Sequence, residues 1–393
     1  MDNKALLAQD IQARHIRVQQ KMQEDGIDAC ILSTSVNVFY MVGAIYNGYF
    51  YLPADGEPIH FLKRITDIQL GNAHYIRKPE QLFDELQKMN RPLPKTVALE
   101  VDVLSYTDCN RLVSSLHIQS ISNASVLLRQ IRSVKSDFEI DQIRACARMH
   151  EAVYKQIPQV YRTGMTDIEL QCEIEHLMRR HGSLGLFRSY GANMDIYMGS
   201  LLVGENAETP SPFDFALGGK GENDVLPLGA SGERIKQGDT IMVDMAGNYS
   251  PWMTDMTRVF SVGKLVDIAY QAHQVSIDIN NTVMQIAKAG VACSELYNVA
   301  AKMVKESHLE PYFMGTRQQA KFIGHGLGLE INEPPVLTPR SDELLLAGTV
   351  FALEPKFVIP QVGAVGIENT YLITEDGIEK LTLLDEEIIN LEN

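Results

Sequence analysis

Acidic side chains recur inside apolar, strand-like segments of the C-terminal half of this chain. Asp244 stands within IMVDMA, Asp255 follows eleven residues later, and Glu354 and Glu368 lie in TVFALEPKFV and VGAVGIENTYLIT. Asp and Glu are depleted in strands and are almost never buried alone, because an unpaired buried carboxylate is costly. Four such groups would also repel one another. The pattern therefore predicts positive charge among them, most economically divalent cations bound through oxygen.

A fifth ligand is predicted at His325, in KFIGHGLGLEINEPP. Glycines on both sides of His325 allow a close approach of the backbone. A lone histidine is more often structural, and a lone carboxylate more often accepts hydrogen bonds at a strand end. The metal hypothesis therefore depends on the whole set, which suits two divalent ions, with Mn, Co, Fe or Zn all acceptable. The predicted ligands are Asp244, Asp255, His325, Glu354 and Glu368.

The length and the net charge of the chain limit the number of its domains and the kinds of partner it can have. The chain has 393 residues, enough for two or three domains, and its 22% charged residues are ordinary for globular proteins. A net charge of −15 without a basic block argues against nucleic acid and membrane partners. No signal peptide or membrane span is recognised, and the five cysteines include no CxxC pair. A cytoplasmic location with free thiols is expected.

Residues 1–130 are predicted to form an α/β domain. Its helix-like stretch at 80–89 lies among strand-like runs at 28–33, 49–52, 59–62 and 96–102. The boundary is placed near 130, where the charged segment VKSDFEID leads into a helix. Ser136 and Glu139 form a capping-box pattern at the start of that helix. Residues 131–393 then carry the acidic strands.

The C-terminal part contains an internal echo. The strings TGMTDIEL (163–170) and AGVACSEL (289–296) each follow a long helical run, and each precedes another helix. In both, a glycine is followed five residues later by Glu-Leu. In the first string, Thr166 and Glu169 form a second capping box. The echo predicts two related α/β halves with a site at their seam.

The ordered set of five ligands resembles the metal site of the pita-bread metallopeptidases, which include methionine aminopeptidase, aminopeptidase P, prolidase and creatinase. The strings DMAGNYSPWMTDMTRVF, GHGLGLEINEPP, LEP and GIENTYLIT match that family in order and spacing. The N-terminal part is similar to the creatinase-type domain of prolidases. The resemblance implies an α/β (α+β) chain, with a creatinase-type domain at 1–130 and a pita-bread catalytic domain at 131–393.

The resemblance also implies an activity, that of a dinuclear metal-dependent hydrolase similar to Xaa-Pro aminopeptidases and dipeptidases. Asp244 would chelate one ion, His325 with Glu354 the other, and Asp255 and Glu368 would bridge both, manganese being the first expectation. A hydroxide between the ions would attack the amide of a short peptide, with Glu354 as general base. Since related proteins are often homodimers, a homodimer is expected.

The chain departs from the family where substrate is handled. Family peptidases have histidines at the positions of Asn332 and Ser211, and aminopeptidase P and prolidase commonly have Arg at that of Gly366. Asn332 can still donate a hydrogen bond, but it cannot exchange a proton near neutral pH. The catalytic candidates are Glu354, Asn332 and Ser211. The expected walls of the substrate pocket are Tyr249, Trp252 and Phe213.

Three functions compete at this point. The first is a peptidase acting on short peptides, and the second is a creatinase-like hydrolase or lyase acting on a small non-peptide compound. The third is a catalytically inactive binding module. Retention of all five ligands argues against the third. The two missing histidines weaken the first, but the commonest chemistry of the family still places it ahead of the second.

Overall fold

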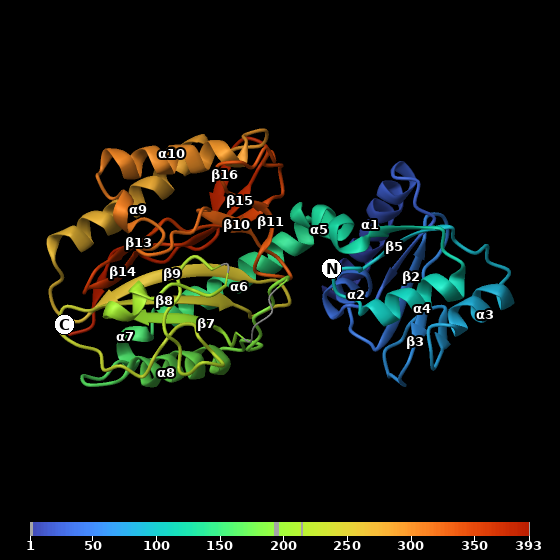
Figure 1. Cartoon of the computed structure of the whole chain (residues 1–393), viewed down its shortest axis with the longest axis horizontal. Helices are drawn as coiled ribbons and strands as arrows, with labels where there is room; N and C mark the ends of the chain where they lie inside the picture. Colours follow the sequence, from blue (N-terminus) through green and yellow to red (C-terminus); the bar gives the residue numbers. More distant parts are fainter. Residues whose placement is uncertain (1–2, 192–195, 214, 393) are drawn as a thin grey trace. The chain divides into compact units, whose positions relative to one another are not determined.

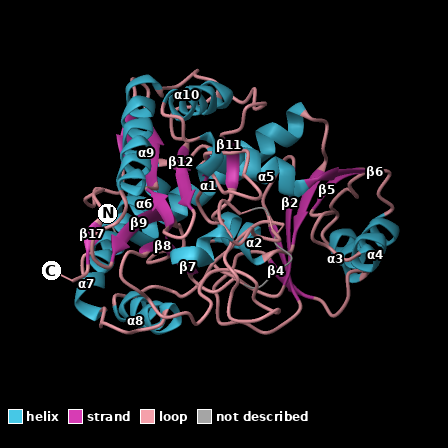
Figure 2. Cartoon of the chain, turned by 60° about the vertical axis from the view of Figure 1, so that its left-hand side comes forward, coloured by secondary structure: helices cyan, strands magenta, loops and turns pink. Residues whose placement is uncertain are grey.

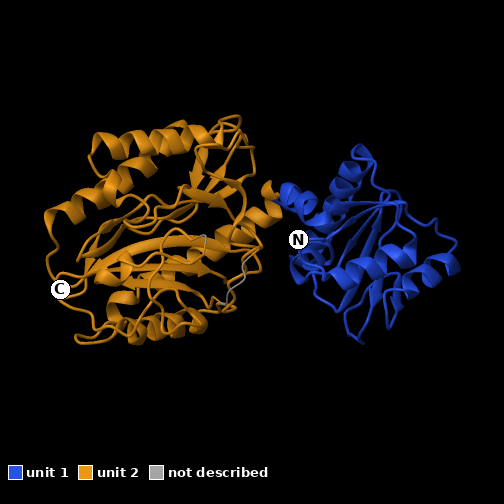
Figure 3. Cartoon of the chain, in the orientation of Figure 1, with its two compact units in different colours: residues 1–132 blue, residues 133–393 orange. Residues whose placement is uncertain are grey.

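Residues 3–191, 196–213 and 215–392 are described by the structure, a computed structural model (Figure 1). The chain divides into two compact units, residues 1–132 and residues 133–393 (Figure 3). Within the described residues, no helix combines the length and the apolar character needed to cross a membrane.

Unit 1 is built on a six-stranded mixed sheet in the order β4-β3-β2-β1-β5-β6. The strands are β1 (Ala29–Leu32), β2 (Gly48–Pro53), β3 (Ile59–Leu62), β4 (Ala73–Tyr75), β5 (Thr96–Leu99) and β6 (Ser120–Asn123). The helices are α1 (Asn3–Glu24), α2 (Ser35–Val42), α3 (Gln81–Lys88), α4 (Tyr106–Leu116) and α5 (Ala124–Ser133). The predicted α/β alternation and its four strands are confirmed.

The apolar patterns of unit 1 explain its packing. Leu82 and Leu86 lie one helical turn apart on α3, and Leu112 and Leu116 do so on α4. All four are fully buried and belong to the same cluster as the sheet residues Ile31, Tyr51, Phe61 and Val97. Side chains four residues apart share a helix face, so each helix covers the sheet with one stripe.

Unit 2 places helices on both sides of its strands. Helices α9 and α10 lie on one side, and α7 and α8 lie on the other (Figure 1 and Figure 2). The helices are α6 (Asp137–Tyr154), α7 (Ile157–Val160), α8 (Asp167–Arg180), α9 (Asp267–Ile286) and α10 (Cys293–Glu306), with short 3₁₀ turns η1 (Gly204–Glu208) and η2 (Glu310–Tyr312). Both predicted capping boxes form, at Ser136 with Glu139 and at Thr166 with Glu169.

Three sheets make up the strand layer of unit 2. The four-stranded order is β17-β9-β8-β7, the five-stranded order is β11-β10-β12-β15-β16, and β13 pairs with β14. The first sheet contains β7 (Gly199–Val203), β8 (Thr240–Gly247), β9 (Thr254–Ser261) and β17 (Ile389–Asn390). The others contain β10 (Gly324–Gly326), β11 (Glu333–Val336), β12 (Val350–Leu353), β13 (Lys356–Ile359), β14 (Gly363–Gly366), β15 (Asn369–Ile373) and β16 (Ile378–Lys380). The predicted hairpin at 240–260 is β8 with β9.

The two strings of the internal echo share a backbone conformation and a hydrogen-bond pattern. Gly164 and Gly290 both take a left-handed conformation, with φ of 86° and 89°. The same pair of backbone hydrogen bonds follows each glycine, joining Met165 to Ile235, Asp167 to Glu233, Val291 to Leu345 and Cys293 to Glu343. The two halves of unit 2 therefore begin their second helices in the same way, which supports the predicted duplication.

Arg258 on β9 ties the C-terminal segment to the strand layer. Its side chain is 1% exposed, and all five of its N–H groups are used. The acceptors are the carbonyl oxygens of Thr257, Glu368, Leu384 and Asp385 and the side-chain oxygen of Asn369, at 2.8–2.9 Å. The parallel pairing of β17 with β9 adds backbone hydrogen bonds to the same link.

Candidate metal centre

The β8–β9 hairpin brings the two predicted aspartates to one face. In its register, Asp244 is opposite Thr257 and Ala246 is opposite Asp255. Residues two apart on a strand, and residues directly opposite in an antiparallel pair, share a face. The carboxylates of Asp244 and Asp255 therefore face the same side of the sheet, as the predicted hairpin implies.

His325 and Glu354 enter from the neighbouring sheet. His325 on β10 pairs with Ala352 on β12, two residues before Glu354. His325 Nε2 lies 3.4 Å from Glu354 Oε1 and 3.8 Å from Asp255 Oδ2. The flanking glycines are needed for this approach, since a Cβ on Gly324 or Gly326 would lie 2.2 Å or 2.1 Å from a backbone oxygen.

Glu368 joins the two sheets at the same place. Its backbone forms an isolated bridge with Thr257, whose hydroxyl donates to Glu368 Oε2 at 2.7 Å. Asp255, His325 and Glu368 each offer one ligand atom within 4.8 Å of the other two. Asp255, Glu354 and Glu368 are buried. The five residues predicted as ligands thus lie together in one cluster, at the meeting of the two halves of unit 2.

Lys356 is a member of this cluster that sequence reasoning missed. Its Nζ donates to Glu354 Oε2 at 2.7 Å, to Asp244 Oδ2 at 2.8 Å and to Glu368 Oε2 at 3.0 Å. A signal for it exists in the printed sequence. Lysine is rarely buried, yet Lys356 stands in the apolar run LEPKFVIP, at the two-residue spacing from Glu354 that puts extended residues on one face.

Lys356 and His325 do not change the pKa values of all the carboxyl groups equally. Burial alone would lower the pKa of Lys356, but Asp244, Glu354 and Glu368 raise it well above its usual value. Burial opposes ionisation of Glu354 as well, yet Lys356 and His325 lower the pKa of its carboxyl to about 2. Glu354 and Lys356 are therefore both charged. At the same time Glu354 is a weak base.

At the other edge of the cluster, Lys356 and His325 offset only part of the rise in the pKa values of the carboxyls. Burial and the charge of Asp244 raise the pKa of Asp255 to about 7, and burial and Asp255 raise that of Glu368 well above its usual range. Burial alone would lower the pKa of His325, but Glu354 and Asp255 raise it to about 10. Without a metal, protons take the place of positive charge at this edge.

An ion fits the residues at this edge. Glu368 Oε1 is buried and has no hydrogen-bond partner in the described part of the chain. A buried carboxylate oxygen without a partner is unfavourable unless something else, such as a cation, binds it. Glu368, Asp255 and His325 form a set of two carboxylates and one imidazole, which suits Mn, Fe, Co or Zn.

The two residues that stand at the family's histidine positions are occupied with backbone groups. Asn332 accepts from the N–H of Tyr190 at 2.8 Å and donates to its carbonyl at 2.9 Å. Ser211 Oγ accepts from the N–H of Phe213 at 3.0 Å. Both side chains hold loops in place in this structure.

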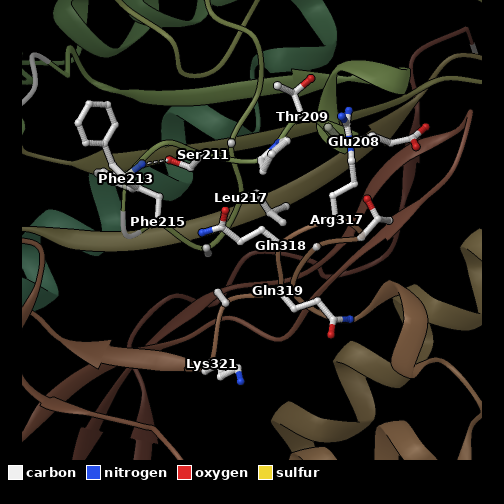
Figure 4. A pocket seen from close by; sticks show the side chains of 17 residues that line it. Glu208, Thr209, Ser211, Phe213, Phe215, Leu217, Arg317, Gln318, Gln319 and Lys321 are labelled. Atoms are coloured by element: carbon white, nitrogen blue, oxygen red, sulfur yellow. Dashed lines mark hydrogen bonds between the residues drawn. The ribbon is translucent and has the colours of Figure 1, made fainter.

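A cavity of about 210 Å³ lies beside Ser211, and Figure 4 shows the side chains around it. Phe213, Arg317 and Lys321 are among its lining residues. The other two expected pocket walls pack near α6 instead. Trp252 donates to Glu139 at 3.2 Å, and the ring of Tyr249 lies 6.2 Å from that of His150.

Gly366, which stands where an arginine is common in relatives, has no room for a side chain. It lies directly across the ladder from Lys356, with φ of 123°. A Cβ at this position would lie 2.7 Å from Pro355 O and 3.0 Å from Lys356 Cα. The arginine is therefore excluded here by the backbone, and a lysine stands on the facing strand.

Comparison with known proteins agrees with this arrangement. Residues 141–375 match the model of metallopeptidase family M24, and residues 14–134 match that of the creatinase/prolidase N-terminal domain. An Xaa-Pro dipeptidase from Pyrococcus furiosus is 26% identical over 371 residues, which cover 94% of this chain and 97% of that protein. An Xaa-Pro dipeptidase from Pyrococcus horikoshii is 25% identical over 378 residues, with 95% and 97% covered.

Solved structures share the fold across almost the whole chain. An Xaa-Pro dipeptidase from Bacillus anthracis superposes with a TM-score of 0.80 at 22% identity, covering 96% of this chain and 99% of the other. The prolidase from Pyrococcus horikoshii OT3 gives a TM-score of 0.77 at 22% identity, with 96% and 100% covered. At these identities the likeness concerns the fold alone.

Proposed function

This chain belongs to metallopeptidase family M24, whose members are metal-dependent hydrolases, and from that premise we propose that it cleaves an amide bond in short peptides. Its catalytic domain follows a creatinase-type N-terminal domain, the order that the sequence predicted. Two relatives that match over 97% of their own length are named Xaa-Pro dipeptidase, which supports a short peptide with proline as the substrate class.

The observation that carries the proposal is the cluster of Asp255, His325 and Glu368 with its unpartnered carboxylate oxygen. A divalent ion bound there supplies a Lewis acid that polarises a carbonyl and acidifies a water molecule. Glu354, 3.4 Å from His325, is at the same centre and is the residue we assign as proton acceptor. Its ion pair with Lys356 keeps it ionised but weakens it as a base, which favours slow turnover.

Finer features of the centre also stay proposals. Two carboxylates with one imidazole support manganese as the first candidate, with Co, Zn and Fe as alternatives. The sequence predicts two ions bridged by hydroxide, and the geometry at Asp255, His325 and Glu368 supports one of the two positions. The five described cysteines are free, which supports a cytoplasmic location. A homodimer is expected from the resemblance, and light scattering tests it against the monomer mass of 43.9 kDa.

A second candidate function is favoured by Asn332 and Ser211. Asn332 binds both backbone groups of Tyr190, and Ser211 accepts from the N–H of Phe213, so neither position offers the ring N–H with which the family's histidines hold a peptide carbonyl. Loss of one donor at such a position typically lowers the rate by about 10²–10³. A small non-peptide amide, processed by a creatinase-like hydrolase or lyase, is therefore the alternative substrate class.

One assay separates the two candidates. The manganese-loaded protein is incubated with Xaa-Pro dipeptides, longer Xaa-Pro peptides, and cyclic or N-methylated amides, and the products are identified by mass spectrometry. Release of an N-terminal residue from an Xaa-Pro substrate, abolished in Glu354→Gln and kept in the surface variant Glu379→Gln, supports the proposal. Turnover of a non-peptide amide with no peptide cleaved would favour the alternative.

A further inference from the structure

We propose that the ammonium group of Lys356 takes the place of one of the two metal ions of this centre, so that the chain binds a single divalent ion. Asp255, His325 and Glu368 hold that ion. The inference deepens the proposed function and rests on its metal-dependent character. It does not depend on the identity of the substrate.

The first argument is the way in which Lys356 is bound. An ammonium group has three N–H donors and no acceptor, and each donor here meets a carboxylate oxygen. The three acceptors belong to different predicted ligands, Asp244, Glu354 and Glu368, at 2.7–3.0 Å. These oxygens surround Nζ as they would surround a cation. A divalent ion sharing them would compete for the same lone pairs and be repelled by the ammonium charge.

The second argument is that Lys356 is fixed in place. Its side chain is 1% exposed, and its Cα lies in the β13–β14 ladder opposite Gly366. Its N–H contacts Met314 Sδ at 3.3 Å, and its carbonyl accepts from Met314 N at 2.8 Å. The backbone of Lys356 is therefore held on both sides, and its buried side chain keeps Nζ among the three carboxylates.

The third argument is that the remaining ligand atoms form one coherent site. Glu368 uses Oε2 for Lys356 and Thr257, and its Oε1 is left without a partner among the described residues. Glu368 also offers one carboxylate oxygen within 4.8 Å of a ligand atom of Asp255 and of a ligand atom of His325. Asp255 is held at its backbone by Thr370, which accepts from its N–H at 2.9 Å and donates to its carbonyl at 2.8 Å.

A metal count tests the inference. The full chain is stripped with a chelator and titrated with Mn²⁺, and bound metal is measured by elemental analysis, calorimetry and electron paramagnetic resonance. Wild type is expected to bind one ion per chain with the spectrum of an isolated Mn²⁺. Lys356→Gly, which removes both the charge and its volume, is expected to bind two spin-coupled ions. Lys135→Gly, which removes a buried lysine paired with Glu333 at 3.1 Å in the same unit, should still bind one.

A second pair of variants keeps the test decisive if Lys356→Gly does not fold. Asp244 binds the ammonium and not the ion, so Asp244→Asn should keep one ion at nearly wild-type affinity, whereas Asp255→Asn should lose about tenfold or more. Wild type binding two coupled ions, or none, would overturn the inference, as would equal losses in the two aspartate variants. Because every readout is bound metal, absence of peptide cleavage would count against the proposed substrate and leave the single-ion centre standing.

Discussion

Thr257 and Glu368 are joined through both backbone and side chain. Each N–H donates to the other's carbonyl at 3.3 Å, and the Thr257 hydroxyl donates to Glu368 Oε2 at 2.7 Å. Thr257 belongs to β9 of the first half of unit 2, and Glu368 precedes β15 of the second half. The candidate centre is therefore assembled across the seam of the duplicated halves, and this pair is one of the links that align them.

Replacing Thr257 with valine should destabilise the protein through Glu368. Thr257 is fully buried, and loss of its hydroxyl removes a hydrogen bond to a charged group, worth about 1.5–3 kcal/mol. The matched variant Thr240→Val removes a bond at 3.2 Å to the neutral carbonyl of Val362, so it should cost about 0.5–1.5 kcal/mol. Urea unfolding of the Mn²⁺-loaded proteins, in which the Glu368 carboxylate is ionised, measures both. Equal losses would show that the carboxylate contributes nothing extra.

Removing Lys356 should make folding depend on metal. Without metal, Lys356→Gly leaves the buried carboxylates of Glu354 and Glu368 and the partly exposed carboxylate of Asp244 without their cation, and breaking a buried ion pair costs about 3–5 kcal/mol. Adding Mn²⁺ should then raise the thermal midpoint of the variant by more than that of wild type, because ions bind only the folded state. Scanning calorimetry with and without Mn²⁺ gives the comparison, with Lys135→Gly as control. The idea fails if the metal-induced shifts are the same in all three proteins.

Asn332 should protect the backbone of Tyr190. Its amide makes two hydrogen bonds to that residue and acts as a substitute for a strand partner. Asn332→Ala removes both, and Asn332→Asp keeps the acceptor but sets a carboxylate against the Tyr190 carbonyl. Hydrogen exchange at the Tyr190 amide should therefore accelerate in the alanine variant and less in the aspartate variant. Unchanged exchange in Asn332→Ala would mean that Asn332 does not hold the Tyr190 backbone. Its amide would then be available for the catalytic role that the sequence suggested.

Stability should fall in mild acid because of His273. Burial lowers its pKa from the usual 6.5 to about 4, and its Nδ1 accepts from Gly366 N, so the neutral ring donates from Nε2 to the Glu386 carbonyl. The unfolded chain binds this proton more tightly. The contribution is thus complete above the unfolded pKa of 6.5 and is lost as the pH falls towards 4. At about pH 5 the loss is about 2 kcal/mol.

A variant without His273 isolates that effect. In His273→Gln the group cannot titrate, so the difference in unfolding free energy between wild type and variant should shrink by about 2 kcal/mol between neutral pH and about pH 5. His308→Gln, at an exposed position, should run parallel to wild type. A constant difference for His273→Gln would mean that His273 does not cause the acid sensitivity.

The cluster formed by the five predicted ligands could be anticipated because their setting is unusual along the chain itself. Local sequence alone shows that a carboxylate such as Asp244 or Glu368 stands in an apolar strand. Such a group needs a polar or charged partner whatever the fold. Strand alternation and the hairpin at 240–260 then indicated which side chains share a face. The capping boxes were equally local, because each needs only a Ser or Thr and a Glu three residues later.

The rest depended on partners that are distant in sequence. Lys356 was overlooked because its role depends on Asp244, which is 112 residues away along the chain, although its spacing from Glu354 was visible. Asn332 was weighed as a donor to substrate, whereas its partner Tyr190 is 142 residues away. Trp252, expected in the pocket wall, packs against Phe138 with ring centroids 5.6 Å apart. No local pattern specifies which of several apolar surfaces an aromatic ring will cover.

The five hydrogen bonds of Arg258 make the order of synthesis matter. Two of its acceptors, Leu384 and Asp385, are made 126 and 127 residues after it, and β17, which pairs with β9, is made later still. Until then a guanidinium in β9 lacks these partners, three residues from Asp255 in the same strand. A growing chain that stops before Leu384 therefore carries every predicted ligand but cannot complete this link to the strand layer. We expect that removing residues 384–393 reduces metal uptake, although none of the predicted ligands is removed.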